Sequence, residues 1–256
     1  MPHTDFDPKE YGFAFNNSWN FDAAEEKDLY ETFAGYLNRG TIAGTLMFGP
    51  LGSFSIAMGI LALRRQMKVH LTSTSTFGLC GGMSFAALDY HKAGRQPSKM
   101  PHPPDPGTEL HHYIWQRQRD SLIHDGAKFL AWVLALKYPH LLLSLRGPAW
   151  VQDQSEKEWG KLTRSVNQGE PIPIGLVRDT NNVFDDHQVL AIGYEGTFAH
   201  GEIFLYDPNC SGRKLAIHIG IKEGTFVGDE DCQSSPAAKL GLRGFFCEHY
   251  RPSDPP

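Results

Sequence analysis

Short apolar segments bounded by turn residues fill the last third of the chain, and they constrain the fold more than any other feature. Their length and their content of β-branched and aromatic residues predict β-strands. We expect strands at Ile172–Val177, Gln188–Tyr194, Ile203–Tyr206, Lys214–Ile219 and Gly244–Tyr250. Because helical patterns precede the strands instead of alternating with them, the order favours an α+β fold with an antiparallel sheet.

The preceding part of the chain predicts four helices. Apolar residues recur at helical spacing in residues 22–38, 80–94, 109–137 and 156–167. Asp22 and Glu25 form a capping-box pattern at the start of the first helix, and Gly126 predicts a break in the third. Residues 12–19 favour a short strand or extended arm. Five prolines predict a rigid surface connection at 97–107.

Size and charge narrow the classes of function. The chain has 256 residues, of which 41% are hydrophobic, so one domain spanning 1–256 can bury a sufficient core without a disulfide or metal. The formal net charge is −5, whereas nucleic-acid binding needs a surplus of Lys and Arg on one face. We therefore expect no nucleic-acid partner.

Four cysteines, Cys80, Cys210, Cys232 and Cys247, lie far apart and form no Cys-x-x-Cys pair. Residues 1–20 lack the basic start and the apolar stretch of a secretory signal. The protein is therefore expected in the cytoplasm, or exported without a cleaved signal peptide, with free thiols as the default. The alternative is one disulfide, for which Cys232 and Cys247 are the preferred pair. No metal or other cofactor is expected, because zinc sites usually draw two ligands from one tight turn.

An uncharged apolar segment at 41–63 is followed at once by Arg64 and Arg65. Its length would span a bilayer, and its basic flank would favour a cytoplasmic side. Gly49-Pro50 and Gly52 divide it into two short pieces, however, which two buried helices or a helical hairpin would explain. The interruption favours the soluble interpretation, and membrane contact through 41–63 stays open.

One cysteine has the setting of a nucleophile. Cys80 stands within Gly78 to Ser84, after a loop and in the first turn of a predicted helix. There the helix dipole lowers the pKa of a thiol, and free backbone N–H groups can hold an oxyanion. Gly81 and Gly82 would leave the thiol uncovered for a substrate carbonyl. The competing interpretation is an inert buried cysteine.

Two further motifs supply groups that could activate this thiol. His187 begins the apolar segment that runs to Tyr194, a rigid position suited to a general base. Asp207-Pro208-Asn209 follows the next strand, where Asp207 or Asn209 can orient the imidazole. Taken singly, a strand-end histidine and an Asp-Pro-Asn turn need no function. Their order after a helix-start cysteine predicts a thiol enzyme.

In these motifs the chain resembles the papain-like cysteine peptidase superfamily, and in particular bacterial proteins related to the peptidase domains of bacteriocin exporters. The shared pattern is the helix-start Cys-Gly at Cys80, a His-x-Val-x-x-x-Gly-Tyr strand at His187 to Tyr194, and Asp-Pro after the next strand. The chain is also similar to uncharacterised bacterial proteins with Leu-Cys-Gly-Gly-Met, Tyr-Asp-Pro-Asn and a late Arg-Gly-Phe-Phe, here Arg243 to Phe246. The likeness covers residues 77–250 and 12–19.

This resemblance implies a papain-like fold, in which a helical N-terminal part packs on an antiparallel β-sheet. It also implies a role for each matching residue. Cys80 would be the nucleophile, His187 its base and Asp207 the orienting residue, with Asn209 as the second candidate.

The oxyanion donor departs from the family pattern. Papain-like enzymes usually carry a Gln about six residues before the cysteine, where this chain has Thr74. The relatives have an Asn in a Phe-x-Asn-Ser segment, which matches Asn17 here. With Asn17 in that role, residues 22–76 would be an insertion. An oxyanion hole made of backbone N–H groups alone is the alternative.

The expected activity is that of a cysteine hydrolase, in first place a peptidase, which cleaves an amide bond through a Cys-His-Asp triad and an acyl-enzyme. A protein or peptide is the expected substrate. One alternative is a papain-like deamidase or transferase, because fold and triad do not determine the acceptor; it could act as a delivered toxin or effector with an inhibitor or immunity protein as partner. The other is a catalytically inactive binding module.

Other clusters carry weaker signals. The acidic run Asp229 to Asp231 could bind a cation, but a charged surface loop is the simpler interpretation. His111 and His112 are expected near the surface at a helix start. The five tryptophans are spread out and favour core or groove packing: Trp19, Trp115, Trp132, Trp150 and Trp159.

Overall fold

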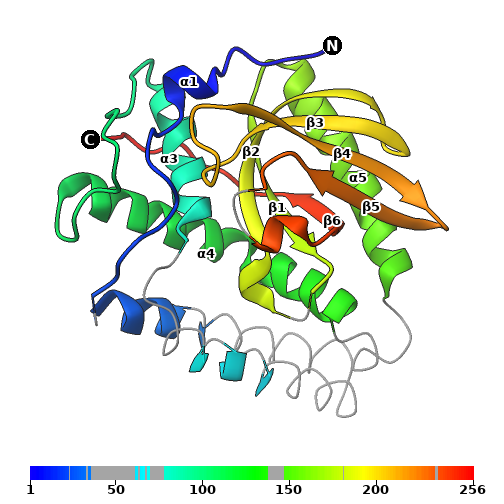
Figure 1. The fold of residues 1–256 in the computed structure, drawn as a ribbon, viewed down its shortest axis with the longest axis horizontal. Helices are drawn as coiled ribbons and strands as arrows, with labels where there is room; N and C mark the ends of the chain where they lie inside the picture. Colours follow the sequence, from blue (N-terminus) through cyan, green and yellow to red (C-terminus); the bar gives the residue numbers. More distant parts are fainter. Residues whose placement is uncertain are drawn as a thin grey trace.

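A β-barrel and a cluster of helices lie side by side in the computed structural model (Figure 1). The structure describes residues 1–22, 24–32, 34–35, 61–62, 64–66, 68–69, 78–137, 147–180, 182–233 and 236–256. Helices α3 (Cys80–Lys92) and α4 (Glu109–Lys137) stand beside the barrel with the short helix α1 (Pro8–Tyr11). Helix α5 (Pro148–Asn167) packs against the barrel itself.

Six antiparallel strands form the barrel, each hydrogen-bonded to the next along the chain. They are β1 (Ile172–Arg178), β2 (His187–Thr197), β3 (His200–Tyr206), β4 (Lys214–Lys222), β5 (Thr225–Glu230) and β6 (Leu242–Cys247). Two short 3₁₀ helices, η2 (Val183–Asp185) and η3 (Pro236–Lys239), precede β2 and β6. Pairing of β6 with β1 closes the barrel.

The predicted papain-like fold, with a helical N-terminal part packed on an antiparallel β-sheet, is wrong. The sheet is antiparallel and follows helices, as the α+β order predicts, but it closes on itself. Strand β5 was absent from the strands predicted from the sequence. It pairs with β4 along its length and with β6 at Gly228–Leu242. Its charged end, Asp229 and Glu230, had indicated a loop. Without β5, no strand would connect β4 to β6, and the sheet could not close into a barrel.

Strand β2 joins the two parts of the molecule because both of its faces are buried. Successive side chains of a strand point to opposite faces. Val189 and Ala191 belong to the barrel core, which also contains Leu162 of α5. Leu190 and Ile192 belong to a second core that contains α3 and the N-terminal aromatic side chains. Helix α3 is therefore held on the outer face of the strand that carries His187.

The glycines after Cys80 serve close packing. A Cβ at Gly82 would stand 2.3 Å from the backbone oxygen of Ile114 in α4, so only glycine permits this approach of the two helices. A Cβ at Gly81 would stand 2.1 Å from Oε1 of Gln188. Both positions face protein, and residues 81–90 are buried throughout.

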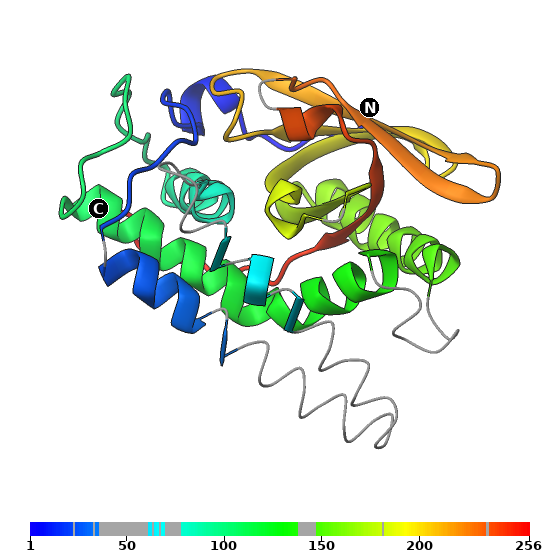
Figure 2. The ribbon, with the colours of Figure 1, turned by 60° about the horizontal axis from the view of Figure 1, so that its bottom comes forward.

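Several predicted helix features are confirmed. Asp22 Oδ1 accepts hydrogen bonds from the backbone N–H groups of Ala24 (2.8 Å) and Glu25 (2.9 Å), and Glu25 Oε2 accepts one from Asp22 N (3.0 Å), which completes the capping box. Residues 24–32 are helical and lie along α4 (Figure 2). Helix α4 continues through Gly126, so the predicted break is wrong, and α5 begins at Pro148, earlier than expected.

The N-terminal aromatic segment is extended but forms no named strand within the described residues. Phe13, Phe15 and Trp19 are buried against α3, and Phe13 N donates a hydrogen bond to the Tyr206 hydroxyl (3.3 Å). The apolar segment 41–63 lies outside the described residues except for 61–62. In the part of the chain that is described, no helix combines the length and apolar character needed to cross a bilayer.

The cysteine predictions need correction. Cys210 and Cys232 form a disulfide, whereas Cys232 and Cys247 had been the preferred pair. Cys80 and Cys247 are free. Cys247 is buried in β6, where its Sγ contacts the backbone oxygen of Glu158 (3.4 Å), and burial raises the pKa of its thiol. The two thiols meet because Cys210 follows β3 and Cys232 follows β5, and β4 pairs with both of these strands.

Candidate active site

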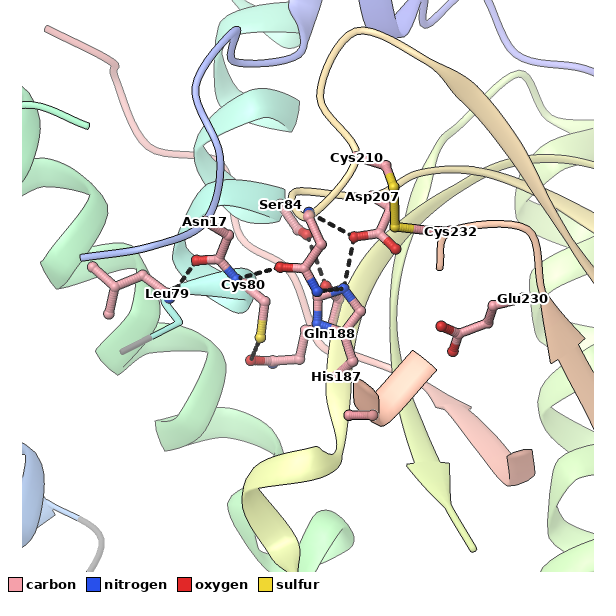
Figure 3. Close-up of polar contacts among 12 residues, drawn as sticks. Asn17, Leu79, Cys80, Ser84, His187, Gln188, Asp207, Cys210, Glu230 and Cys232 are labelled. Atoms are coloured by element: carbon pink, nitrogen blue, oxygen red, sulfur yellow. Dashed lines mark hydrogen bonds and ion pairs between the residues drawn. A yellow bond between two sulfur atoms is a disulfide. The ribbon is translucent and has the colours of Figure 1, made fainter. Parts of the chain in front are cut away.

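Three chain segments bring the predicted triad together. Cys80 is the first residue of α3, His187 is the first residue of β2, and Asp207 directly follows β3 (Figure 3). In the β2–β3 pairing Leu190 lies opposite Tyr206, so the residues after β3 return beside the start of β2. Helix α3 packs on the outer face of β2 and places Cys80 at the same end.

His187 and Asp207 form a buried pair. His187 Nε2 lies 2.7 Å from Asp207 Oδ1, and both residues are almost fully buried. The second candidate orienting residue, Asn209, is also close, with Nδ2 3.3 Å from the same ring nitrogen. Its backbone N–H donates to Asp207 Oδ1 (2.7 Å), which holds the carboxylate in place.

Hydrogen-bond directions indicate which of Asp207 and Asn209 can orient the His187 imidazole. Asn17 Oδ1 accepts from Leu79 N (2.6 Å) and Trp19 Nε1 (3.1 Å), so Asn17 Nδ2 must face Asn209 Oδ1, 3.0 Å away. Asn209 therefore turns its own amide nitrogen, a donor, toward the imidazole. Of the two residues, only Asp207 can accept a hydrogen bond from a protonated Nε2 of His187. Nδ1 of His187 is then the ring nitrogen left for the Cys80 thiol.

The electrostatics favour an ion pair between Cys80 and His187. Burial by itself raises the pKa of the Cys80 thiol, but the hydrogen bond and positive charge of His187 outweigh it and lower the pKa below its usual range. Burial likewise opposes the charged imidazole. The charge and hydrogen bond of Asp207, together with Cys80, nevertheless raise the pKa of His187 to about 10. A thiolate beside an imidazolium is the nucleophilic form of a cysteine.

Asn17 organises the start of α3. Its Oδ1 accepts the N–H of Leu79, the residue before the helix, and Gly82 N donates to Gln118 Oε1 (2.9 Å). The Asn17 amide nitrogen carries a second hydrogen beside the one given to Asn209, and Asn17 lines the cleft next to Cys80. Sequence reasoning had named this residue as the candidate oxyanion donor, and the structure brings it to the site. Thr74 lies outside the described residues.

Sequence reasoning missed a second row of polar residues beside the thiol. Gln188 Oε1 lies 3.9 Å from Cys80 Sγ and accepts from Gln118 Nε2 (3.3 Å) and Ser121 Oγ (3.5 Å). Gln188 Nε2 donates to Glu248 Oε1. A glutamine directly after His187 in an apolar strand was the one available signal. Gln118, Ser121 and Glu248 come from α4 and from the chain after β6, and only the tertiary structure brings them there.

A cleft of about 470 Å³ contains Cys80 and His187. One face of α4 forms a long wall of it, with side chains at helical spacing from Gln118 to Phe129. Residues of β1, η2 and the end of β6 also line it, together with Leu29 of the helical residues 24–32. A volume of this size accommodates a few residues of an extended peptide.

The predictions for the other residue clusters have different outcomes. Glu230 is buried and accepts a hydrogen bond from Arg178 (2.7 Å), so a charged surface loop is the wrong interpretation for this residue of the acidic run. His111 is also buried, bonded to Glu25 Oε1 (2.6 Å), and not near the surface as predicted. Among the described residues, no three His, Cys, Asp or Glu side chains are grouped as a metal would require. Trp19, Trp115 and Trp132 are buried, as predicted.

Comparison of the chain with protein-family models, curated proteins and solved structures found no match. The resemblance to papain-like peptidases therefore stays a prediction from the motifs, and the chemistry must be argued from the site.

Proposed function

We propose that the protein is a cysteine hydrolase that cleaves an amide bond in a peptide or protein. The contact of His187 Nε2 with the buried carboxylate of Asp207, at 2.7 Å, carries this proposal. It stabilises a charged imidazole beside Cys80, which is partly exposed at the wall of the cleft. An inert structural cysteine needs neither a cleft nor a buried base with its own carboxylate.

The reaction follows from these positions. The Cys80 thiolate attacks the amide carbonyl carbon, a C–S bond forms, and the carbonyl electron pair moves to oxygen. As the C–N bond breaks, the His187 imidazolium gives its proton to the leaving amine. A water molecule then transfers a proton to His187 and attacks the thioester, which releases the acid and restores Cys80. Asp207 stabilises the imidazolium throughout.

Two donors are placed to hold the oxyanion. The backbone N–H of Cys80 belongs to the first turn of α3, where helix N–H groups have no partner within the helix. The second hydrogen of the Asn17 amide is the other donor. A pair of such donors stabilises the charge that develops on the carbonyl oxygen in the transition state.

The test is the pH dependence of alkylation of Cys80 by iodoacetamide, followed by mass spectrometry of the Cys80 peptide. Wild-type protein should react at a pH well below the free thiol pKa of about 8.5, and His187→Ala should shift the profile upward. His200→Ala, which removes an exposed histidine of β3, is the matched control and should leave it unchanged. A wild-type thiol that titrates near 8.5 and ignores His187 would overturn the proposal.

The reaction itself is then identified with peptide substrates. A chain break shows hydrolysis of the peptide bond, whereas a gain of about one mass unit at Gln shows a deamidase acting through the same thioester chemistry. Loss of either product in Cys80→Ala assigns it to this site.

A further inference from the structure

Glu248 is a buried carboxyl group in the wall of the cleft, and the proposed triad does not use it. It follows β6 and is only 7% exposed. Its Oε1 accepts a hydrogen bond from Gln188 Nε2, while its Oε2 is buried without a hydrogen-bond partner among the described residues. A buried polar atom without a partner is costly. On a residue that lines a binding cleft, such an atom indicates that a ligand group is missing.

A chain of hydrogen bonds with a fixed direction ends on this carboxyl group. Gly82 N, a backbone group that can only donate, donates to Gln118 Oε1 (2.9 Å). The other end of that amide, Gln118 Nε2, donates to Gln188 Oε1 (3.3 Å). Gln188 must therefore turn its own Nε2, a donor, toward Glu248 Oε1. Because Oε1 is the acceptor, Oε2 is the oxygen of Glu248 that would carry a proton.

The contacts around Glu248 favour the neutral acid. Within the described part of the chain, no Lys, Arg or His side chain forms an ion pair with it. Lys128, whose positive charge acts on Glu248, is bonded elsewhere, to Glu158 Oε1 (3.0 Å) and to Cys247 O (2.7 Å). A buried carboxylate without a cationic partner is unfavourable relative to its protonated form.

The pKa of Glu248 agrees with these contacts. Burial raises it well above its usual range, against the opposing effect of the hydrogen bond from Gln188. The negative charges of Asp125 and Cys80 raise it further, and the charge of Lys128 lowers it without reversing the shift. Glu248 therefore holds its proton in the empty cleft.

A neutral acid determines which group the free oxygen can bind. Oε2 then donates through its O–H, so the missing partner is an acceptor. The acceptors that recur along a peptide are its backbone carbonyl oxygens.

Gln188 connects this donor to the thiol. Its Oε1 lies 3.9 Å from Cys80 Sγ, while its Nε2 holds Glu248, so Glu248 stands one amide group beyond the thiol. Two residues of an extended peptide span about 7 Å. A peptide whose attacked carbonyl lies at Cys80 can therefore bring a carbonyl group up to two residues away to Glu248.

We propose that Glu248 is a substrate-binding residue that donates a hydrogen bond from Oε2 to a backbone carbonyl oxygen in the acyl part of the substrate. The inference rests on the proposed function, because it assumes that Cys80 attacks a peptide. The acyl part stays attached to Cys80 through both steps of that reaction, so a contact there orients the substrate for each step. A site built to bond an oxygen discriminates against an analogue that lacks it.

Two nitriles that differ in one carbonyl group test the contact. The Cys80 thiol adds to a nitrile carbon, a C–S bond forms and the nitrogen takes the proton, which yields a reversible thioimidate. Acetylglycyl-aminoacetonitrile has a second amide on the acyl side, which pentanoyl-aminoacetonitrile replaces with methylene groups in a chain of equal length. Their dissociation constants follow from the protection of Cys80 against iodoacetamide. At pH 6, wild type should bind the acetylglycyl compound at least about tenfold more tightly than the pentanoyl compound.

Matched variants assign this preference to the donor. In Glu248→Gln, the amide oxygen can accept from Gln188 and the amide nitrogen donates in place of Oε2, so the preference should stay within about threefold of wild type. Glu248→Met has similar length and no donor, and the preference should fall below about threefold. Glu195→Met makes the same change at an exposed position of β2 and should leave it unchanged. Binding of the pentanoyl compound to Glu248→Met shows that this variant is folded.

Infrared spectroscopy tests the protonation of Glu248 separately. At pH 6, the difference spectrum between wild type and Glu248→Gln should contain the C=O stretching band of a neutral carboxyl group. Binding of the acetylglycyl compound should shift that band. A carboxylate band in its place would overturn the inference.

Three binding results would also overturn it. They are equal binding of the two nitriles by wild type, a preference that survives in Glu248→Met, and a preference that Glu248→Gln loses as fully as Glu248→Met. Each of them leaves the proposed hydrolase intact, because a nitrile has still bound at Cys80. The pH profile of alkylation alone decides the proposed function, so the two failures are distinguishable.

Discussion

The side-chain amides of Asn17 and Asn209 are joined by a hydrogen bond of 3.0 Å from Nδ2 to Oδ1, across 192 positions of sequence. The bond connects the segment that begins α3 with the turn after β3 that holds the imidazole. Asn17 also accepts the N–H of Leu79 (2.6 Å). One side chain thus sets both the start of α3 and the direction of the Asn209 amide next to His187.

Asn17→Asp should separate the roles of this side chain. The carboxylate can still accept from Leu79 N and Trp19 Nε1, but it loses the amide donor. We expect acylation of Cys80 by p-nitrophenyl acetate to slow by about 100-fold, the usual effect of removing one oxyanion donor. Asn16→Asp adds the same charge at the neighbouring exposed position and is the control. Equal rates in both variants would exclude Asn17 as an oxyanion donor.

Asp207 and Asn209 should differ sharply on substitution. Asp207→Asn removes the negative charge that raises the pKa of His187, so the imidazolium that stabilises the Cys80 thiolate is weakened and the pKa of the thiol rises. The alkylation rate of Cys80 at pH 6 should fall by tenfold or more, since one pKa unit is worth about a factor of ten. Asn209→Ala should lower it by less than about threefold. The reverse order would make Asn209 the orienting residue.

Gly82→Ala should destabilise the fold. The new Cβ would stand 2.3 Å from the backbone oxygen of Ile114, which cannot move without separating α3 from α4. Overpacking of this kind costs about 1–3 kcal/mol, measurable as a lower free energy of unfolding in urea. Gly160→Ala is the control, because that helical glycine of α5 has open space around its Cβ position. It should stabilise the protein by about 0.5–1 kcal/mol.

Reduction of the Cys210–Cys232 disulfide should weaken the fold near the site. The bond closes a loop across a separation of 22 residues, for which the chain-entropy model gives about 3 kcal/mol. Urea unfolding with and without dithiothreitol measures this difference. A variant carrying Cys210→Ser and Cys232→Ser should have the stability of the reduced protein and should not respond to dithiothreitol. An unchanged wild type would show that the bond contributes little.

The stability of the protein should depend on pH through Glu248. Burial raises the pKa of this carboxyl group in the folded protein above its value in the unfolded chain. Folding therefore takes up a proton in the interval between the two values, and this contribution is lost as pH rises through that interval. Glu248→Gln carries no such proton. The free energy of unfolding of the variant minus that of wild type should therefore be larger at pH 8 than at pH 4. Parallel pH profiles of the two proteins would contradict the shift.

Much of the secondary structure could be predicted because local periodicity records which face of a segment is buried. The helix from Cys80, the capping box at Asp22 and five of the six strands follow from such patterns. The same reasoning missed β5, because its acidic end predicted an exposed loop, whereas Glu230 is buried. Its charge is balanced by Arg178 from β1, a partner that no local pattern identifies.

The residues of the proposed triad could be predicted from their settings, a helix start, a strand start and a strand end, because such positions hold side chains rigidly. Their surroundings could not. Glu248 reaches Gln188 only because β6 closes the barrel against β1. Asn17 reaches Asn209 only because the N-terminal segment packs along α3.

The sequence by itself determined the kinds of local structure and the three groups of the proposed thiol chemistry, since these depend on neighbouring residues. Only the tertiary structure decided barrel closure, the Cys210–Cys232 pairing and the cleft beside Cys80. The physical reason is that these features depend on contacts between segments distant in sequence. Which segments meet is decided by the packing of both cores on the two faces of β2.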